Sequence, residues 1–291
     1  MESVAVGTIE HPGIPRRLGR LPWLPLLLLA PVVIFGIFGR HIAPHSVTAF
    51  NLDATLKPPV FMHGGAWAHV LGSDPLGRDT FSLLIVGART SLIISVVGVA
   101  LAGAVGVAVG VAAGSRGGAL DELLMRVVDM QLAVPPILLA VLLAGALGGG
   151  LKTVIATIAV AFWPTYARVV RGETLALRQR DFVQLAIVAG SGPFRIARKH
   201  LLPNLLSSIV VVATLQLGAA VGVESALSFL GLGVQAPNTS WGLMISDGKG
   251  YLDTAWWVAT FPGVAIALTV LGANLLGDWL RDALDPTMRS R

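Results

Sequence analysis

Uncharged apolar stretches, most of them long enough to cross a membrane as a helix, recur along the whole chain. A helix needs about 20 apolar residues to cross the roughly 30 Å hydrocarbon core of a bilayer. Six stretches that lack aspartate, glutamate, lysine and arginine approach or exceed that length: 21–39, 90–115, 130–151, 153–167, 201–223 and 254–277. The fourth is short, but its helix can continue past Arg168 to Val170, because an arginine side chain reaches back to the interface. The pattern predicts an all-α integral membrane protein with six transmembrane helices.

A further uncharged stretch, 225–246, has a different character. Its later part contains residues that break or bend helices, namely Gly231, Gly233, Pro237, Asn238 and Gly242. Irregular backbone at membrane depth is tolerated only where protein or a water-filled cavity covers it. This stretch therefore predicts a re-entrant or outer hairpin at about 224–253, and not a seventh span.

Composition supports a membrane protein. Hydrophobic residues make up 54% of the 291 residues, charged residues only 13%, and the mean hydropathy is +0.76. Soluble globular chains carry about 25% charged residues, so both a soluble domain and a disordered chain are excluded. The absence of cysteine excludes disulfides and cysteine-ligated metal.

The distribution of basic residues predicts the orientation. With the N-terminus in the cytoplasm, six spans place 15 lysine and arginine residues on the cytoplasmic side and 6 on the other side. Cytoplasmic loops are enriched in these residues, so both termini are expected in the cytoplasm. Three arginines precede the first span, as in a signal peptide, but 21–39 is longer than a typical signal-peptide core and lacks a clear cleavage site. The first span is therefore expected to be an uncleaved anchor.

Small residues recur every four positions in the second span. They are Gly98, Ala102, Gly106, Gly110 and Gly114. On a helix this spacing keeps them on one face, where another helix can approach closely. The pattern favours tight packing within the chain, with a dedicated subunit contact as the alternative.

A patterned polar segment separates the fourth and fifth spans. Phe182, Leu185, Ala186 and Ala189 fall on one helical face, Gly190 to Pro193 breaks the helix, and a basic helix follows up to Pro203. Such a segment either lies on an anionic membrane surface or docks on a cytoplasmic partner.

This segment resembles the EAA loop of ABC importer permeases, which reads Glu-Ala-Ala, three residues, Gly, nine residues, then Ile-x-Leu-Pro. The chain has Gln184-Leu185-Ala186, then Gly190, then His200-Leu201-Leu202-Pro203 at the same spacing. The identities agree at Ala186, Gly190, Leu202 and Pro203. Segments 71–92, 121–130, 224–242 and 275–286 further resemble the C-type permease subunit of oligopeptide and dipeptide importers, a subfamily that includes nickel importers. The resemblance covers about residues 20–286.

The resemblance implies a MetI-like permease fold in a multi-pass protein of the bacterial plasma membrane. The implied organisation is a cytoplasmic tail (1–20), a first helix with an extracytoplasmic segment (21–86), a five-helix transmembrane domain (87–283) with the EAA loop at about 174–203, and a cytoplasmic tail (284–291). It implies a permease for oligopeptides or dipeptides, with nickel, glutathione or another small solute as the alternative.

The resemblance also implies partners. These are a homologous B-type permease, two ATP-binding domains that are separate or fused, and an extracytoplasmic substrate-binding protein. The chain has no phosphate loop of the form G-x-x-x-x-G-K-[ST]. Gly248-Lys249 comes nearest to the motif, but the first glycine would have to be at position 243, which is Leu243. The chain is therefore expected to be non-catalytic, with ATP and Mg²⁺ bound by the partner subunits.

Two sets of site residues follow from the resemblance. The first set is expected to dock on the ATPase: Gln184, Leu185, Ala186, Gly190, Leu202 and Pro203, with Asp181, Arg171 and Arg195 as flanking polar contacts. The second set is expected either to brace the outer mouth or to meet the binding protein: Ser73, Asp74, Gly77, Arg78, Asp79 and Glu224. For residues 73–79, the alternative is a structural turn that contains an Asp–Arg pair. For Glu224, a hydrogen-bonded group that orients the outer hairpin is favoured over a gate or a contact with a peptide N-terminus.

Other kinds of site and protein are less favoured. His41, His45, His63 and His69 have spacings that match no common metal-ligand motif, so ordinary interfacial histidines are expected. A secondary transporter or channel would need ionisable relays within the spans or an internal repeat. The spans carry almost no charge, no clear repeat is present, and no motif of an intramembrane enzyme appears.

Overall fold

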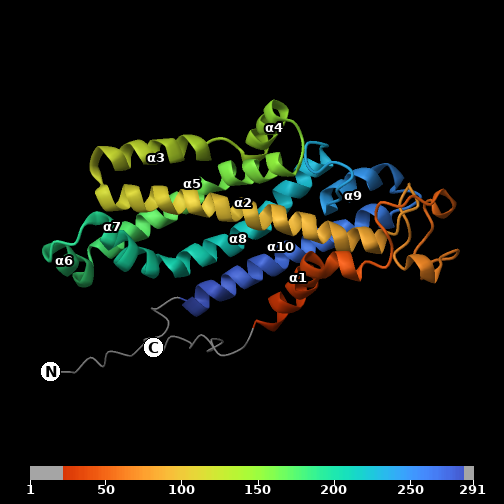
Figure 1. Ribbon diagram of the computed structural model, residues 1–291, viewed down its shortest axis with the longest axis horizontal. Coiled ribbons are helices and arrows are strands. Elements are labelled where there is room, and N and C mark those ends of the chain that lie inside the picture. Colours follow the sequence, from red (N-terminus) through yellow and green to blue (C-terminus); the bar gives the residue numbers. More distant parts are fainter. Residues whose placement is uncertain (1–21, 285–291) are drawn as a thin grey trace, which may run out of the picture.

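The computed structural model describes residues 22–284, so nearly all of both predicted tails lies outside the described residues. The described chain is an elongated bundle of helices (Figure 1). Its long helices are α1 (Trp23–Ile42), α2 (Thr80–Arg116), α5 (Leu151–Arg178), α8 (Leu202–Phe229) and α10 (Trp257–Leu284). Within residues 22–284, five helices, one of them α8 together with the turns that precede it, are long and apolar enough to cross a membrane. These five confirm the predicted all-α membrane fold.

The predicted span at 130–151 is not one continuous helix. The stretch is divided between α3 (Gly118–Leu132) and α4 (Pro136–Leu147), which are bent by 87° relative to each other. Pro135 lies outside α4 and Pro136 occupies its first turn. A proline disfavours helical backbone at the residue before it and donates no backbone hydrogen bond. Only if this bent pair counts as one span does the described chain have six.

The stretch 225–246 does not form a spanning helix. Helix α8 continues to Phe229, and an irregular loop then leads to α9 (Trp241–Gly248), which has only 8 residues. The loop and α9 lie at one end of the bundle, together with the segment 43–79 (Figure 1). We call this the α9 end. The opposite end carries α6 (Asp181–Val188) and α7 (Pro193–Ile196), and we call it the α6 end.

The stripe of small residues on α2 lies against α5. A Cβ atom added to Gly106 would lie 2.3 Å from the carbonyl oxygen of Trp163, and one added to Gly110 would lie 2.7 Å from that of Ala167. Gly98 and Gly114 face Ile158 and Thr174 at similarly short range, and Ala102 is fully buried. The α2–α5 contact is therefore backbone against backbone, a close approach that larger residues prevent.

The Gly106→Ala substitution is expected to destabilise the protein by about 1–3 kcal/mol, because the added methyl overlaps a backbone atom that cannot rotate away. The matched control is Gly172→Ala on α5, where nothing lies within 4 Å of the added Cβ. The control is expected to be neutral or slightly stabilising. Midpoints of thermal unfolding in detergent check the pair, and equal midpoints for Gly106→Ala and wild type would contradict the packing.

Candidate functional site

Helix α6 buries one side chain, that of Val183, and leaves most of the others exposed. Val183 is fully buried in a cluster with Val170, Ile196, Leu201 and Leu205. On the remaining surface of the same helix, Leu185 is 68% exposed and Val188 is 84% exposed. Phe182 is also exposed, as is Phe194 on α7. We call Phe182, Leu185, Val188 and Phe194 the α6 apolar surface.

Gly190 ends α6 in a Schellman turn. Its φ angle is +76°, in the left-handed region that glycine adopts without strain. The Gly190 N–H donates to the Ile187 carbonyl at 2.9 Å, and the Ser191 N–H donates to the Ala186 carbonyl at 3.0 Å. These two bonds satisfy carbonyls that the end of a helix otherwise leaves free. The turn therefore fixes how α6 is presented relative to α7.

Of the three residues that depart from the EAA pattern, Leu185 is exposed, whereas Gln184 and His200 make local contacts. The Gln184 side-chain amide donates to the Arg178 carbonyl at 2.7 Å and so caps the end of α5. The His200 ring lies 6.2 Å, centre to centre, from the Phe182 ring. Leu202 and Pro203 begin α8, where the missing N–H of proline costs nothing. Gln184 and His200 thus stabilise the loop where it meets the bundle.

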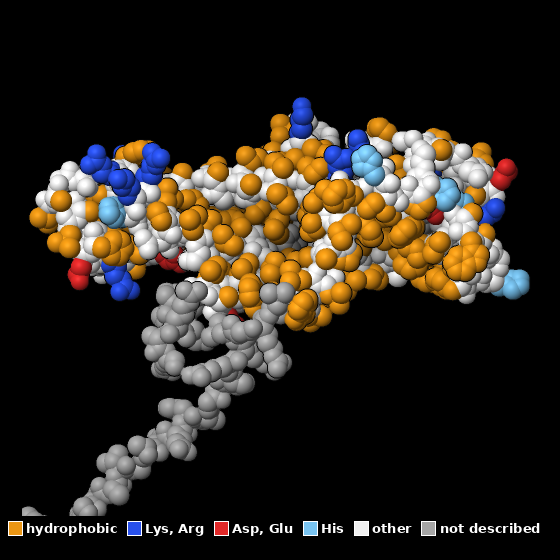
Figure 2. Space-filling view, turned by 60° about the horizontal axis from the view of Figure 1, so that its bottom comes forward, with side chains coloured by type: hydrophobic (Ala, Val, Ile, Leu, Met, Phe, Trp, Pro, Cys, Tyr) orange, Lys and Arg blue, Asp and Glu red, His pale blue; other side chains and the backbone are white. Residues whose placement is uncertain are grey.

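The charged residues predicted around α6 have different surroundings. Asp181 lies in the first turn of α6, where the helix dipole favours a negative charge. Arg195 is exposed near Arg198 and Lys199, and basic side chains gather at this end of the molecule (Figure 2). Arg171, in contrast, forms an ion pair with Asp121 of α3, with Nη2 at 2.7 Å from Oδ2. Arg171 therefore joins α5 to α3 and is already paired within the chain.

A cavity of about 600 Å³ opens between α5, α8 and α10. Its polar lining comes from Thr165 and Glu173 on α5, Ser207, Ser208 and Gln216 on α8, and Arg281 on α10. Sequence patterns did not indicate it, because its lining residues come from three helices and share no motif. A lining of this mixed polarity can admit a hydrated polar solute.

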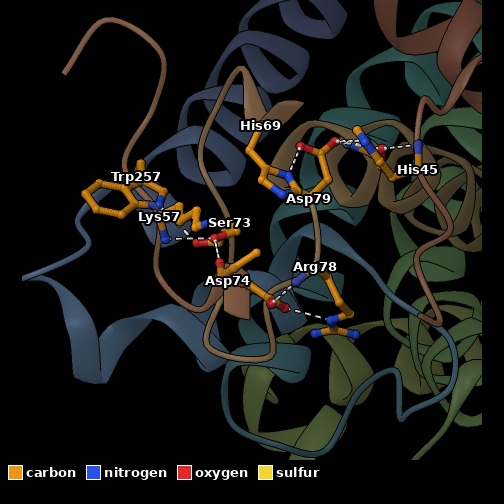
Figure 3. Close-up of polar contacts among 10 residues, drawn as sticks. His45, Lys57, His69, Ser73, Asp74, Arg78, Asp79 and Trp257 are labelled. Carbon is orange, nitrogen blue, oxygen red and sulfur yellow. Dashed lines mark hydrogen bonds and ion pairs between the residues drawn. The ribbon is translucent and has the colours of Figure 1, made fainter. Parts of the chain in front are cut away.

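At the α9 end, Asp74 organises the turn before α2 (Figure 3). Its carboxylate accepts from the backbone N–H groups of Leu76 and Arg78 at 2.9 and 2.8 Å, and from Nε of Arg78 at 2.7 Å. Gly77 has a φ of +70°, and an added Cβ would lie 1.7 Å from the Asn51 carbonyl oxygen. These contacts make 73–79 a rigid turn.

The same turn is fastened to the rest of the α9 end. The Trp257 indole of α10 donates to the Ser73 carbonyl at 3.1 Å, and the Ser73 hydroxyl donates to the Ala54 carbonyl. Arg78 also lies 3.9 Å from Asp247 of α9. Burial raises the pKa of the Asp247 carboxyl, while the nearby Arg78 opposes that rise. The predicted set from Ser73 to Asp79 thus joins the 43–79 segment to α9 and α10.

Asp79 caps the N-terminus of α2. Its Oδ2 accepts from the Ser82 N–H at 2.8 Å and from the Ser82 hydroxyl at 2.7 Å, which satisfies one of the free donors at a helix start. Two imidazoles, from His45 and His69, also face this carboxylate (Figure 3). The spacing of His45 and His69 in the sequence matches no common metal-ligand motif and so did not indicate that they approach each other.

Glu224 is fully buried on α8 and is surrounded by serine hydroxyls. Ser91 of α2 donates to Oε2 at 2.9 Å, and Ser228 donates to Oε1 at 2.8 Å. Ser228 in turn accepts from the Val234 N–H at 3.2 Å and lies 3.4 Å from the Ser240 hydroxyl. The network joins α2 and α8 to the loop before α9, an arrangement that orients this hairpin.

Comparison with known families decides what kind of protein this is. Residues 106–290 match the family described as the binding-protein-dependent transport system inner membrane component. This chain belongs to that family. The matched region contains the α6 end, the cavity and Glu224, whereas the 43–79 segment lies before it. A family member with several apolar helices is a multi-pass inner-membrane protein.

Curated relatives of this transport-system component match nearly its whole length. It is 42% identical over 264 residues to the dipeptide transport system permease protein DppC of Escherichia coli (strain K12), covering 91% of this chain and 88% of that protein. It is 38% identical to the probable D,D-dipeptide transport system permease protein DdpC of the same strain, covering 92% and 91%. It is also 43% identical to the glutathione transport system permease protein GsiD of Escherichia coli O6:K15:H31 (strain 536 / UPEC), covering 90% and 85%.

The fold of this family member has solved counterparts. A chain of the inward-facing MetNI methionine ABC transporter superposes with a TM-score of 0.57 at 24% identity. The match covers 70% of this chain and 97% of that one. At 24% identity this similarity is evidence for the fold alone, and it confirms the predicted MetI-like architecture.

Proposed function

We propose that this chain is the permease subunit of an ATP-driven ABC importer of dipeptides or oligopeptides. It forms half of the membrane channel, and a homologous B-type permease forms the other half. Two ATP-binding domains, separate or fused, bind ATP and Mg²⁺ and drive transport. A substrate-binding protein delivers the peptide from the opposite side of the membrane.

The α6 apolar surface carries this proposal. Four large apolar side chains that are exposed close to basic residues are typical of a protein-contact surface rather than of a free surface in water. Val183 and the Gly190 turn hold α6 firmly to the bundle, so a push on α6 is passed to α5 and α8. The chain has no phosphate loop of its own, so the push comes from a separate ATPase.

The proposed orientation follows from the same surface. With the α6 end in the cytoplasm, the exposed Arg195, Arg198 and Lys199 lie on the side where basic residues are enriched. Both termini then lie in the cytoplasm, and the 43–79 segment lies outside. The cavity between α5, α8 and α10 then lies on the route of the substrate.

The test is co-purification and uptake with the genetic neighbours of this chain. When they are expressed together, the tagged chain is expected to retain an ATPase, and cells that lack the chain are expected to lose uptake of a labelled dipeptide. The 43% identity to GsiD favours glutathione as the second candidate, so unlabelled glutathione and Ni²⁺ serve as competitors. The importer proposal fails if no ATPase is retained, and the peptide proposal fails if only glutathione or Ni²⁺ competes.

A further inference from the structure

Three possible metal ligands from separate parts of the chain converge at the α9 end (Figure 3). His45 follows α1, His69 ends a short 3₁₀ turn (Trp67–His69), and Asp79 caps α2. His69 Nδ1 lies 3.2 Å from Oδ1 of Asp79, and His45 Nδ1 lies 3.6 Å from Oδ2. One ligand atom from each residue lies within 4.8 Å of the other two.

The distances between the ligand atoms of these three residues fit a cation that all three bind. The 3.6 Å between His45 Nδ1 and the carboxylate is longer than a hydrogen bond, so this imidazole faces Asp79 without bonding to it. Two ligand atoms that each lie about 2.0 Å from a tetrahedral zinc ion are about 3.3 Å apart. The observed distances, 3.2 Å to Oδ1 and 3.6 Å to Oδ2 of Asp79, lie on either side of that value, and the three ligand atoms all lie within 4.8 Å of one another.

The surroundings suit a site that a cation can enter. The Asp79 and His69 side chains are only 3% and 12% exposed, whereas that of His45 is 45% exposed and forms the open side. Two hydrogen bonds from Ser82 hold the Asp79 carboxylate, as outer partners commonly hold a metal-binding carboxylate. The His45 backbone N–H also donates to the Ser82 hydroxyl at 3.0 Å, which fixes the start of this segment.

We propose that His45, His69 and Asp79 bind a divalent transition-metal cation of the zinc class, with water completing its coordination. Imidazole nitrogens and one carboxylate are ligands that zinc and its neighbours accept, and three protein ligands leave a position for water. The bound cation joins the end of α1, the 3₁₀ turn and the start of α2. It thereby clips the 43–79 segment to the bundle.

The proposal is tested by zinc binding to the full chain, purified with its partner subunits and without a polyhistidine tag. After treatment with a chelator, the complex is titrated with zinc ions against a chromogenic chelator. The His45→Ala and His69→Ala variants are expected to weaken one zinc site about tenfold or more. His63→Ala is the matched control, because His63 is exposed in the same segment but lies outside the cluster.

A second readout separates binding from folding. Zinc is expected to raise the midpoint of thermal unfolding of wild type and His63→Ala, but not that of His45→Ala, because a ligand stabilises only the state that binds it. If His69→Ala does not fold, the His45→Ala variant is sufficient for the test, because His45 is exposed. Absence of a zinc site in wild type, or an equal loss in His63→Ala and His45→Ala, overturns the proposal. Neither readout depends on transport, so the importer proposal stands or falls separately.

Discussion

The Gly190→Val substitution is expected to reduce substrate uptake about tenfold without lowering the amount of protein in the membrane, because it strains the turn after α6 by about 1–2 kcal/mol or more. Gly190 has a φ of +76°, which a β-branched residue adopts very rarely. The space around it is open, so the added side chain meets no other group. The effect is therefore on the direction in which α6 is presented. Uptake assays and immunoblots of membranes measure the two quantities.

Two companion variants isolate the backbone effect. Asparagine tolerates the left-handed conformation, so Gly190→Asn is expected to retain most uptake. Gly192 has an ordinary φ of −67° and nothing within 4 Å of an added Cβ, so Gly192→Ala is expected to behave as wild type. Full uptake by Gly190→Val would show that the Schellman turn does not set the coupling.

The Glu224→Ala substitution is expected to destabilise the protein by about 2–5 kcal/mol, since it opens a cavity and leaves two buried serine hydroxyls without their acceptor. The Ser91 and Ser228 hydroxyls both donate to this carboxylate. Without the carboxylate, Ser228 loses the partner that fixes its hydroxyl, which in turn accepts a hydrogen bond from the loop before α9. The midpoint of thermal unfolding in detergent measures the loss.

The controls for Glu224 vary charge and burial separately. Glu224→Gln keeps the shape of the side chain and one carbonyl acceptor. Its loss of stability is therefore expected to be less than half of the loss in Glu224→Ala. Glu122→Ala removes an exposed carboxylate that pairs with the exposed Arg126, and it is expected to change stability by less than about 0.5 kcal/mol. If Glu224→Ala unfolds at the wild-type temperature, the serine network does not hold the hairpin.

The long helices could be predicted because hydrophobic burial in a bilayer needs a continuous apolar stretch of known length. The prediction was wrong where Pro135 and Pro136 bend the chain between α3 and α4. Both prolines are uncharged, so a pattern based on charge did not detect them. Helices usually end at or before the residue that precedes a proline, and this rule could have located the bend.

The site was predicted where its residues are close in sequence and missed where they are not. The Gly190 turn and the Asp74–Arg78 pair lie within short segments, so their spacing carries the information. The approach of His45 and His69 to Asp79 depends on how the 43–79 segment returns to α2. For Glu224, the position after an uncharged span indicated a hydrogen-bonded group, but the identity of its serine partners from three elements depends likewise on the packing of distant helices. No local pattern contains that information.

Helix α2 is unbroken over 37 residues, which at 1.5 Å per residue makes a rod of about 55 Å, nearly twice the thickness of the hydrocarbon core. One tip of the rod carries Asp79 and the other lies beside the end of α5, where Arg178 donates to the Gly114 carbonyl. A rod pivoting near its middle behaves as a lever: a tilt of about 5° carries each tip by about 2 Å, in opposite directions. If α2 moves as such a lever, a displacement at the end beside α5 arrives at the Asp79 tip with its direction reversed, and the continuous backbone of the helix is all that it needs.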